Sequence, residues 1–172
     1  MLIKIGPLKE PEGIVDMMLE CHDRIRSFAA LATRLANASE PSQDEIRDAA
    51  ARVSRYFTEA LPLHVADEEQ SIVPRLTGKN PEVDSVLQKM HGEHLDHEAK
   101  LAALVETCNR LKASPEMLDD VRPTLQETAT MLQAEFEAHL KQEEDVVFPA
   151  IRSLLTPEQR TTMLSELRSR RR

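Results

Sequence analysis

The sequence predicts an all-α protein that folds as an up-down-up-down four-helix bundle, followed by a short C-terminal helix. Three observations support this prediction. The 172 residues include only four glycines and one tyrosine, and they are rich in Ala, Leu, Glu, Arg and Gln, which favour helices. Apolar residues recur at helical spacing along most of the chain. Two long segments also repeat one arrangement of His, Glu and Pro.

A chain of this length is expected to form one domain with its own hydrophobic core. We expect residues 1–11 to be an N-terminal leader and residues 12–152 to be the bundle. Residues 153–172 are expected to form a short C-terminal helix and a basic tail. The tail has the sequence RSRRR, and we expect it to be solvated because like charges repel and chain ends fray.

The first helix is expected from Pro11 to about Asn37. Proline and acidic residues suit the first turn of a helix, and Pro11 is followed by Glu12. The apolar stripe of this helix includes His22 near its middle. This histidine is therefore expected to face the bundle interior.

The second helix is expected to begin after Ser42 and to continue to about Leu76. Ser42 followed three residues later by Glu45 is a capping-box pattern, which satisfies backbone N–H groups at a helix start. Pro62 is expected to kink this helix, because proline lacks an N–H group and its ring crowds the preceding turn.

Turn signals separate the remaining helices. Thr77-Gly-Lys-Asn-Pro ends one helix and starts a third over residues 81–112, which carries three histidines. A fourth helical region is expected from Ser114 to just after Pro149, with a break near Pro123. The last short helix begins at Thr156, where a cap, a proline and a capping-box glutamine follow in order.

The repeated segments are HVADEEQSIVPRL, which begins at His64, and HLKQEEDVVFPAI, which begins at His139. In each segment a glutamate, Glu68 or Glu143, lies four residues after the histidine, and a proline lies ten residues after it. Residues four apart share one face of a helix, about 6 Å apart along its axis. Each segment therefore presents an imidazole and a carboxylate side by side.

The repetition extends to the other two helices. A methionine lies four residues before His22 in the first helix and four before His94 in the third. The sequence thus contains two successive helical hairpins of one design. Paired antiparallel, the hairpins would bring one histidine from each of the four helices to a similar depth in the bundle.

These side chains predict a site for two iron ions. Fe(II) accepts imidazole and carboxylate together, whereas structural zinc sites favour thiolate and calcium sites use oxygen alone. A carboxylate has two oxygens and can bridge two cations, so two glutamates would offset much of the ions' charge, whereas buried alone they would be costly. The predicted ligands are His22 and His64 for one iron, His94 and His139 for the other, and Glu68 and Glu143 as bridges.

Simpler interpretations remain open for individual residues. A single histidine on an apolar helix face is usually a core residue, and a His–Glu pair four apart can be an ordinary hydrogen bond. The identical offsets in two segments favour the metal site. We expect Glu69 and Glu144, one residue beyond the predicted bridges, to be exposed charges. Of His91 and His97, at most one is expected near the metal ions.

The ferritin-like class of di-iron bundles can be tested in the sequence. That class uses Glu-x-x-His, with a glutamate three residues before the histidine. None of the four predicted histidine ligands has a glutamate there; the residues are Leu19, Leu61, His91 and Phe136. The order of residues therefore argues against that class.

The two cysteines, Cys21 and Cys108, lie within helical patterns and have no Cys-x-x-Cys spacing. We expect both to be reduced and packed in the core. Cys21 is next to His22, but neighbouring side chains on a helix diverge, so it is not counted as a ligand. Tyr56 is expected to be a core residue.

Taken together, these motifs resemble the hemerythrin-like, HHE cation-binding domain. The resemblance rests on His22, His64-x-x-x-Glu68, Glu93-His94, His139-x-x-x-Glu143, and the trailing IVPRL and VFPAI, and it covers about residues 12–152. It implies a four-helix bundle with two non-haem iron ions, bridged by the two glutamates and an oxo or hydroxo group. It also implies a small ligand: oxygen, nitric oxide or peroxide.

The sequence departs from the oxygen-carrying members of that family. Those proteins place two histidines four apart on the third helix, whereas Met90 and Glu98 lie four before and four after His94. The fifth histidine is missing unless His91 shifts in or Glu98 substitutes for it. Fewer histidines should leave one iron more open and lower its reduction potential. Sensing, iron handling or peroxide chemistry is then as reasonable an expectation as oxygen carriage.

Two functions follow as hypotheses. The first is a binding protein that senses oxygen, nitric oxide or iron without turnover. The second is a di-iron oxidase or peroxidase that acts in oxidative or nitrosative stress defence. We favour the first, because no dedicated proton donor or substrate pocket can be identified. A bundle without metal is the least favoured alternative.

The composition limits other partners. A net charge of −8 gives no reason to expect nucleic-acid binding, and it disfavours anionic membrane surfaces. No apolar run approaches the roughly 20 residues that span a bilayer. The first ten residues are too short and too charged for a signal peptide. We therefore expect a cytoplasmic protein whose partner is a small diatomic molecule or peroxide, with any protein partner undefined.

Overall fold

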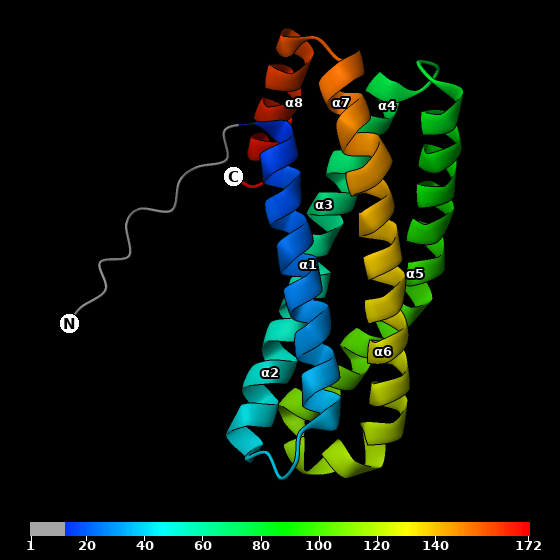
Figure 1. Cartoon of the computed structure of the whole chain (residues 1–172). Coiled ribbons are helices and arrows are strands. Elements are labelled where there is room, and N and C mark those ends of the chain that lie inside the picture. The colour runs from blue at the N-terminus through cyan, green and yellow to red at the C-terminus, as the bar shows by residue number, and fades with distance from the viewer. Residues whose placement is uncertain (1–12) are drawn as a thin grey trace, which may run out of the picture.

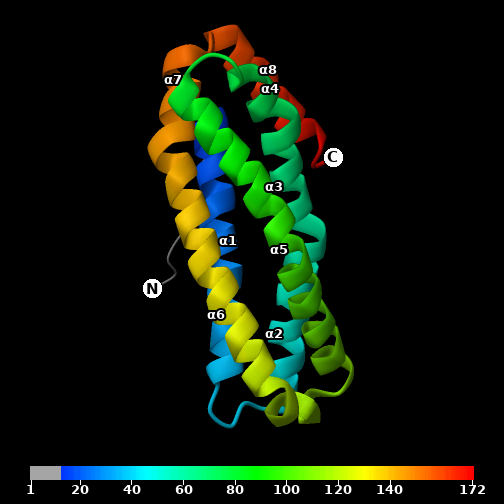
Figure 2. The same ribbon diagram turned by 90° about the vertical axis from the view of Figure 1, so that its right-hand side faces the viewer.

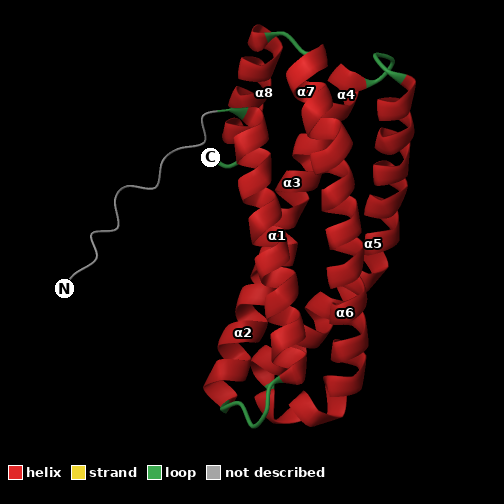
Figure 3. Ribbon diagram, viewed as in Figure 1, coloured by secondary structure: helices red, strands yellow, loops and turns green. Residues whose placement is uncertain are grey.

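The computed structural model describes residues 13–172, so the predicted leader and the predicted helix start at Pro11 lie outside the described residues. The described part of the chain consists of helices joined by short loops, which confirms the all-α prediction (Figure 3). Within it, no helix combines the length and the apolar character that a bilayer crossing requires.

The helices form a bundle of four long rods, where each rod is one helix or a series of helices that continue one another end to end (Figures 1 and 2). The first rod packs against the second and fourth, and the third also packs against the second and fourth. In Figure 1 the turns that follow the first and third rods lie at one end of the bundle, and the turn after the second lies at the other. In chain order the rods are α1 (Ile14–Asn37); α2 (Gln43–Arg55) with α3 (Leu61–Asp67) and α4 (Val73–Leu76); α5 (Pro81–Ala113); and α6 (Leu118–Gln142) with α7 (Phe148–Leu154).

Local sequence signals explain where several helices begin. The Ser42 hydroxyl accepts a hydrogen bond from the N–H of Glu45, whose carboxylate accepts one from the N–H of Ser42. Thr156 and Gln159 form the same predicted capping box at the start of α8 (Pro157–Ser169). The predicted break near Pro123 is wrong, because α6 runs through this residue without interruption.

The second and fourth rods are continuous through widened, π-helical turns. These turns are η1 (Tyr56–Ala60), η2 (Glu68–Ile72) and η4 (Glu143–Val147). The second residue after each turn is a proline: Pro62, Pro74 or Pro149. Proline has no N–H and crowds the carbonyl group four residues earlier, and a wider turn relieves this clash. A π-helical turn thus accommodates Pro62, where the sequence predicted only a kink.

The core consists of two apolar clusters separated by a polar band. The larger cluster lies toward the loop that joins α1 to α2, and the smaller one lies toward α7 and α8. On α1, for example, Met18 belongs to the smaller cluster and Ile25 to the larger, with buried His22 between them. Each of the other three rods also changes cluster across buried polar residues. The polar band consists of these buried polar residues, which include His22, Glu68, His97 and Glu143. It therefore crosses the whole bundle.

Helix α8 folds back against the bundle and buries Met163 and Leu167 in the smaller cluster. The predicted solvated tail is wrong for Arg170 and Arg171, which lie 2.8 and 2.6 Å from the two carboxylate oxygens of Asp67. Asp67 is fully buried. A buried carboxylate requires a charged or hydrogen-bonding partner, and these guanidinium groups provide it.

Candidate metal centre

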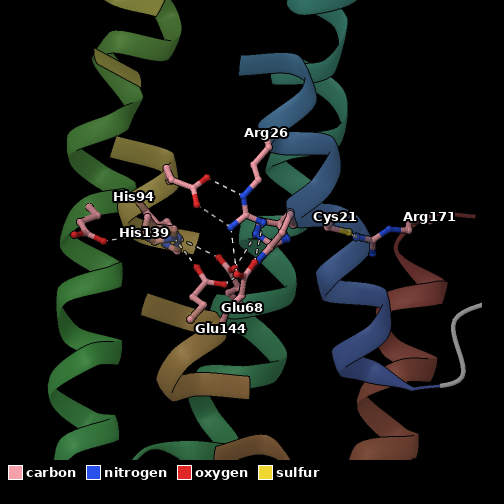
Figure 4. Close-up of polar contacts among 12 residues, drawn as sticks. Cys21, Arg26, Glu68, His94, His139, Glu144 and Arg171 are labelled. Atoms are coloured by element: carbon pink, nitrogen blue, oxygen red, sulfur yellow. Dashed lines mark hydrogen bonds and ion pairs between the residues drawn. The ribbon is translucent and has the colours of Figure 1, made fainter. Parts of the chain in front are cut away.

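The polar band brings together all six predicted metal ligands. Five are buried, and the side chain of the sixth, His94, is 11% exposed. In Figure 4, His94, His139 and Glu68 point toward a common region between the rods. The six side chains come from α1 (His22), α3 (His64), η2 (Glu68), α5 (His94), α6 (His139) and η4 (Glu143).

Glu68 lies between two histidines from different rods. Its Oε1 is 2.8 Å from the Nε2 of His64, the predicted i,i+4 partner. Its Oε2 is 3.0 Å from the Nε2 of His94. One carboxylate thus links α3 and α5, as a bridging ligand must.

Glu143 repeats this arrangement on the opposite hairpin. Its Oε1 is 2.7 Å from the Nε2 of His139, and its Oε2 is 3.0 Å from the Nε2 of His22. Each glutamate therefore offers one oxygen to each side of the site. The repeated His-x-x-x-Glu motif accounts for one contact of each carboxylate, and the other contact is made across the bundle.

The rings of the four histidines lie in two pairs. The ring centroids of His22 and His64 are 5.3 Å apart, and those of His94 and His139 are 4.9 Å apart. Possible ligand atoms within 4.8 Å of one another fall into two groups that share Glu68. One group is His22, His64, Glu68 and Glu143, and the other is Glu68, His94 and His139.

The arrangement of the buried nitrogen and oxygen atoms suits the coordination of metal ions better than it suits hydrogen bonds between the side chains. The Nε2 atoms of His64 and His94, both oxygens of Glu68 and the Oε1 of Glu143 have no hydrogen-bond partner in acceptable geometry. They are nevertheless close together, so their lone pairs converge without being aligned for hydrogen bonds. Divalent ions lie about 2.1 Å from such ligands, which places two ligands at right angles about 3.0 Å apart. Imidazole with carboxylate, and no thiolate, suits iron and neighbouring metals.

Three further carboxylates orient three of the four histidines; these outer carboxylates are Glu69, Glu93 and Glu144. An ionised carboxylate only accepts hydrogen bonds, so each of these rings donates from Nδ1 and keeps Nε2 free for a metal ion. The contacts are His22 to Glu144 at 2.8 Å, His94 to Glu69 at 2.8 Å, and His139 to Glu93 at 2.7 Å.

The prediction that Glu69 and Glu144 are simply exposed charges is therefore wrong. Glu69 contacts His94, and Glu144 contacts His22; in each case the histidine lies on a neighbouring rod. Arg26 holds Glu144 in place with contacts of 2.9 and 3.2 Å. Burial opposes ionisation of Glu144, but hydrogen bonds from Arg26 and His22 lower its pKa. It thus remains a carboxylate at neutral pH.

His64, His94 and His139 favour protonation when no metal is bound. Burial alone would lower their pKa values, but the adjacent glutamates outweigh it. The pKa of His64 is well above its usual value because of Glu68, and Glu143 and Glu93 raise the pKa of His139 to about 9. Metal binding at neutral pH must therefore displace protons.

This shift predicts how the stability of the metal-free protein depends on pH. An unfolded histidine has a pKa near 6.5, so the His139 contribution is complete below about pH 6.5 and is lost as pH rises through about 9. The free energy of unfolding should fall by about 3 kcal/mol across this interval. Urea unfolding of chelator-treated protein at pH 6 and pH 9.5 measures it, and a constant stability would contradict the assignment.

A small apolar cavity adjoins the site. Its volume is about 30 Å³. A water molecule needs roughly 10–15 Å³ of such volume, so the cavity suits a molecule of two or three atoms. It is lined by three predicted ligands, His64, His94 and His139, and by apolar side chains that include Ile25, Leu61, Leu101 and Phe136.

None of the candidate extra ligands occupies the missing fifth-histidine position. His97 is buried and forms part of the cavity wall, with its ring centroid 5.8 Å from that of His139. His91 is largely exposed and contacts Glu69 at 3.1 Å, while Glu98 is exposed. One of the two histidines thus lies near the site, within the limit that the sequence predicted.

The outer carboxylates are the functional residues that sequence reasoning missed. Glu69 and Glu144 occupy equivalent positions in the two repeated segments, and Glu93 directly precedes His94. The duplication that predicted Glu68 and Glu143 as ligands therefore also contained a signal for two of the three outer carboxylates. The contacts of Glu93, by contrast, depend on how α5 and α6 pack.

A helical bundle with buried imidazole and carboxylate donors facing one another belongs to the class of cation-binding bundle proteins. The sequence matches the hemerythrin family, described as the Hemerythrin HHE cation binding domain, over residues 13–151. The chain therefore belongs to this family, which confirms the resemblance found in the sequence. No curated protein and no solved structure is significantly similar to the chain.

Proposed function

We propose that this protein is a non-haem di-iron protein, built as an up-down-up-down four-helix bundle, that binds or senses oxygen, nitric oxide or iron itself. The main support is the position of Glu68 and Glu143, each of which lies between a histidine of one pair and a histidine of the other. A bound pair of iron ions would supply redox chemistry and open coordination positions for a small ligand.

The number of donors supports this proposal. One group of ligand atoms has two imidazoles and both glutamates; the other has two imidazoles and Glu68, with Glu143 Oε1 2.7 Å from the Nε2 of His139. Sites with few histidine and carboxylate ligands leave coordination positions open and are typical of non-haem iron. The residues also limit what reaches the ions, because the adjoining cavity is apolar and holds only two or three atoms. His64, His94 and His139 all line this space, so it adjoins histidines of both pairs.

The outer carboxylates support the same conclusion. They fix the rings of three ligands before any ion is present, which lowers the entropic cost of binding. Such partners commonly change metal affinity by about 10- to 100-fold. A structural bundle would gain nothing from six ionisable side chains, five of them buried, supported in this way.

Anaerobic titration with Fe(II), followed by elemental analysis, tests the proposal. We expect two iron ions per chain. A variant in which the exposed Glu98 and Glu106 are replaced by alanine controls for iron bound by carboxylates outside the site, and it should also bind two ions. Binding of less than one ion per chain by the wild-type protein would refute the di-iron site.

Exposure of the iron-loaded protein to nitric oxide, air or peroxide separates binding from catalysis. A stable and reversible charge-transfer absorption band is expected for a binding or sensing protein. Repeated consumption of oxygen or peroxide, with many turnovers per chain, would instead establish the oxidase or peroxidase function. The absorption spectrum and an oxygen electrode distinguish these results.

A further inference from the structure

His64 is supported differently from the other three histidines. Within the described chain, no carboxylate accepts from its Nδ1, which is buried without a partner in hydrogen-bonding geometry. Cys21 lies on α1 directly before His22, whose ring packs edge-on against the His64 ring with centroids 5.3 Å apart. The orientation of His64 therefore depends on its packing against His22 and not on an outer carboxylate.

Cys21 is in turn contacted from the C-terminal end of the chain. The Nη2 of Arg171 lies 3.7 Å from the Sγ of Cys21 and 2.6 Å from the Oδ2 of Asp67 (Figure 4 shows the Cys21 contact). Asp67 is fully buried and directly precedes Glu68. A single guanidinium group thus contacts the residue before His22 and the residue before Glu68.

The segment that carries Arg171 is fixed in place. Arg170 binds the second oxygen of Asp67 at 2.8 Å and donates to the Ser71 hydroxyl at 2.9 Å. Ser71 also donates to Glu166 of α8 at 2.6 Å, and Arg75 binds the same carboxylate at 2.6 Å. These contacts all join α8 to the helix segment that contains the predicted ligands.

We propose that Arg171 is a positioning residue of the metal centre: through Cys21 it holds the turn of α1 that carries His22, and through Asp67 it holds the helix turn that carries Glu68. The inference rests on the proposed function, because it concerns the two metal positions. The position built on His22 and His64 depends on the C-terminal segment, whereas His94 and His139 are held by outer carboxylates. The two positions therefore differ in how they respond to changes in α8.

Titration with Co(II), which gives visible absorption bands when bound, tests this inference. The wild-type protein should bind two ions per chain. In Arg171→Ala, one of the two binding steps should weaken by about 10- to 100-fold and its absorption bands should shift. The other step should change by less than threefold. Arg172→Ala, which alters an exposed arginine one residue away, should behave like the wild type.

A second pair of variants keeps the test valid if Arg171→Ala folds poorly. Cys21→Ala should weaken the same binding step, whereas Cys108→Ala, at the other buried cysteine, should not. Melting of the metal-free proteins separates positioning from general stability, because a destabilised fold alone would not shift the absorption bands of one step. Two tight sites in both Arg171→Ala and Cys21→Ala would overturn the inference. Failure of the wild type to bind metal would instead overturn the proposed function.

Discussion

Replacement of both Glu68 and Glu143 with glutamine is expected to preserve the helical fold and to abolish tight binding of iron. Glutamine has almost the same shape as glutamate, so packing in the polar band should change little. The loss is electrostatic, because two buried negative charges no longer offset the charge of two cations. By analogy with breaking a buried ion pair, each replacement should cost about 3–5 kcal/mol of binding free energy, or roughly 100- to 4,000-fold in affinity.

Iron content and circular dichroism of the double variant measure these two effects. Replacing the neighbouring Glu69 and Glu144 with glutamine is the matched control, since these residues lie one position further along the same helices. We expect that control to weaken binding by about 10- to 100-fold, because it disturbs ligand orientation alone. Two tightly bound ions in the Glu68→Gln, Glu143→Gln variant would show that these residues are not bridges.

Phe148→Ala is expected to have the largest effect on stability. Phe148 is only 2% exposed, belongs to the smaller apolar cluster, and stacks on the ring of His22 with centroids 5.0 Å apart. Removing a buried phenylalanine side chain usually costs about 3–5 kcal/mol of unfolding free energy. Loss of the stacked ring should also loosen His22 and weaken metal binding.

Urea unfolding and metal titration of the same variants separate these consequences. Phe57→Ala is the matched control, because Phe57 is buried in the larger cluster and stacks on Phe136. It should lose a similar amount of stability, while the folded fraction keeps its metal affinity. Phe148→Leu should lose less stability because it leaves a smaller cavity. A Phe148→Ala protein within about 1 kcal/mol of the wild type would contradict the assigned packing.

Local patterns were sufficient to predict much of the fold and to single out the six side chains that meet in the polar band. The capping boxes at Ser42 and Thr156 involve residues three apart, so a short sequence window contains all of their atoms. The pairing of His64 with Glu68 and of His139 with Glu143 likewise follows from helical spacing. The duplication then made the contacts across the bundle predictable, because equivalent helices place their histidines at similar depth.

Long-range contacts were the part that could not be predicted. Arg171 and Asp67 are 104 residues apart in the sequence, and Arg171 and Cys21 are 150 apart. No periodicity relates such positions, and a basic chain end in isolation resembles a solvated tail. The hydrogen bond between Glu93 and His139 also depends on the packing of two helices. The π-helical turns did have a local signal, since Pro74 and Pro149 each follow a predicted bridge by six residues.

The polar band between the two apolar clusters has a consequence for folding cooperativity. Without metal, the band joins the clusters through desolvated charged groups, whose attraction is largely offset by the cost of burying them. The half that contains α8 can then open without the other, as a separate cooperative unit. Bound ions would tie all four rods together and bind only when both halves are formed. Metal occupancy would therefore decide whether the chain unfolds in one transition or in two, and a protease would distinguish the loaded protein from the empty one.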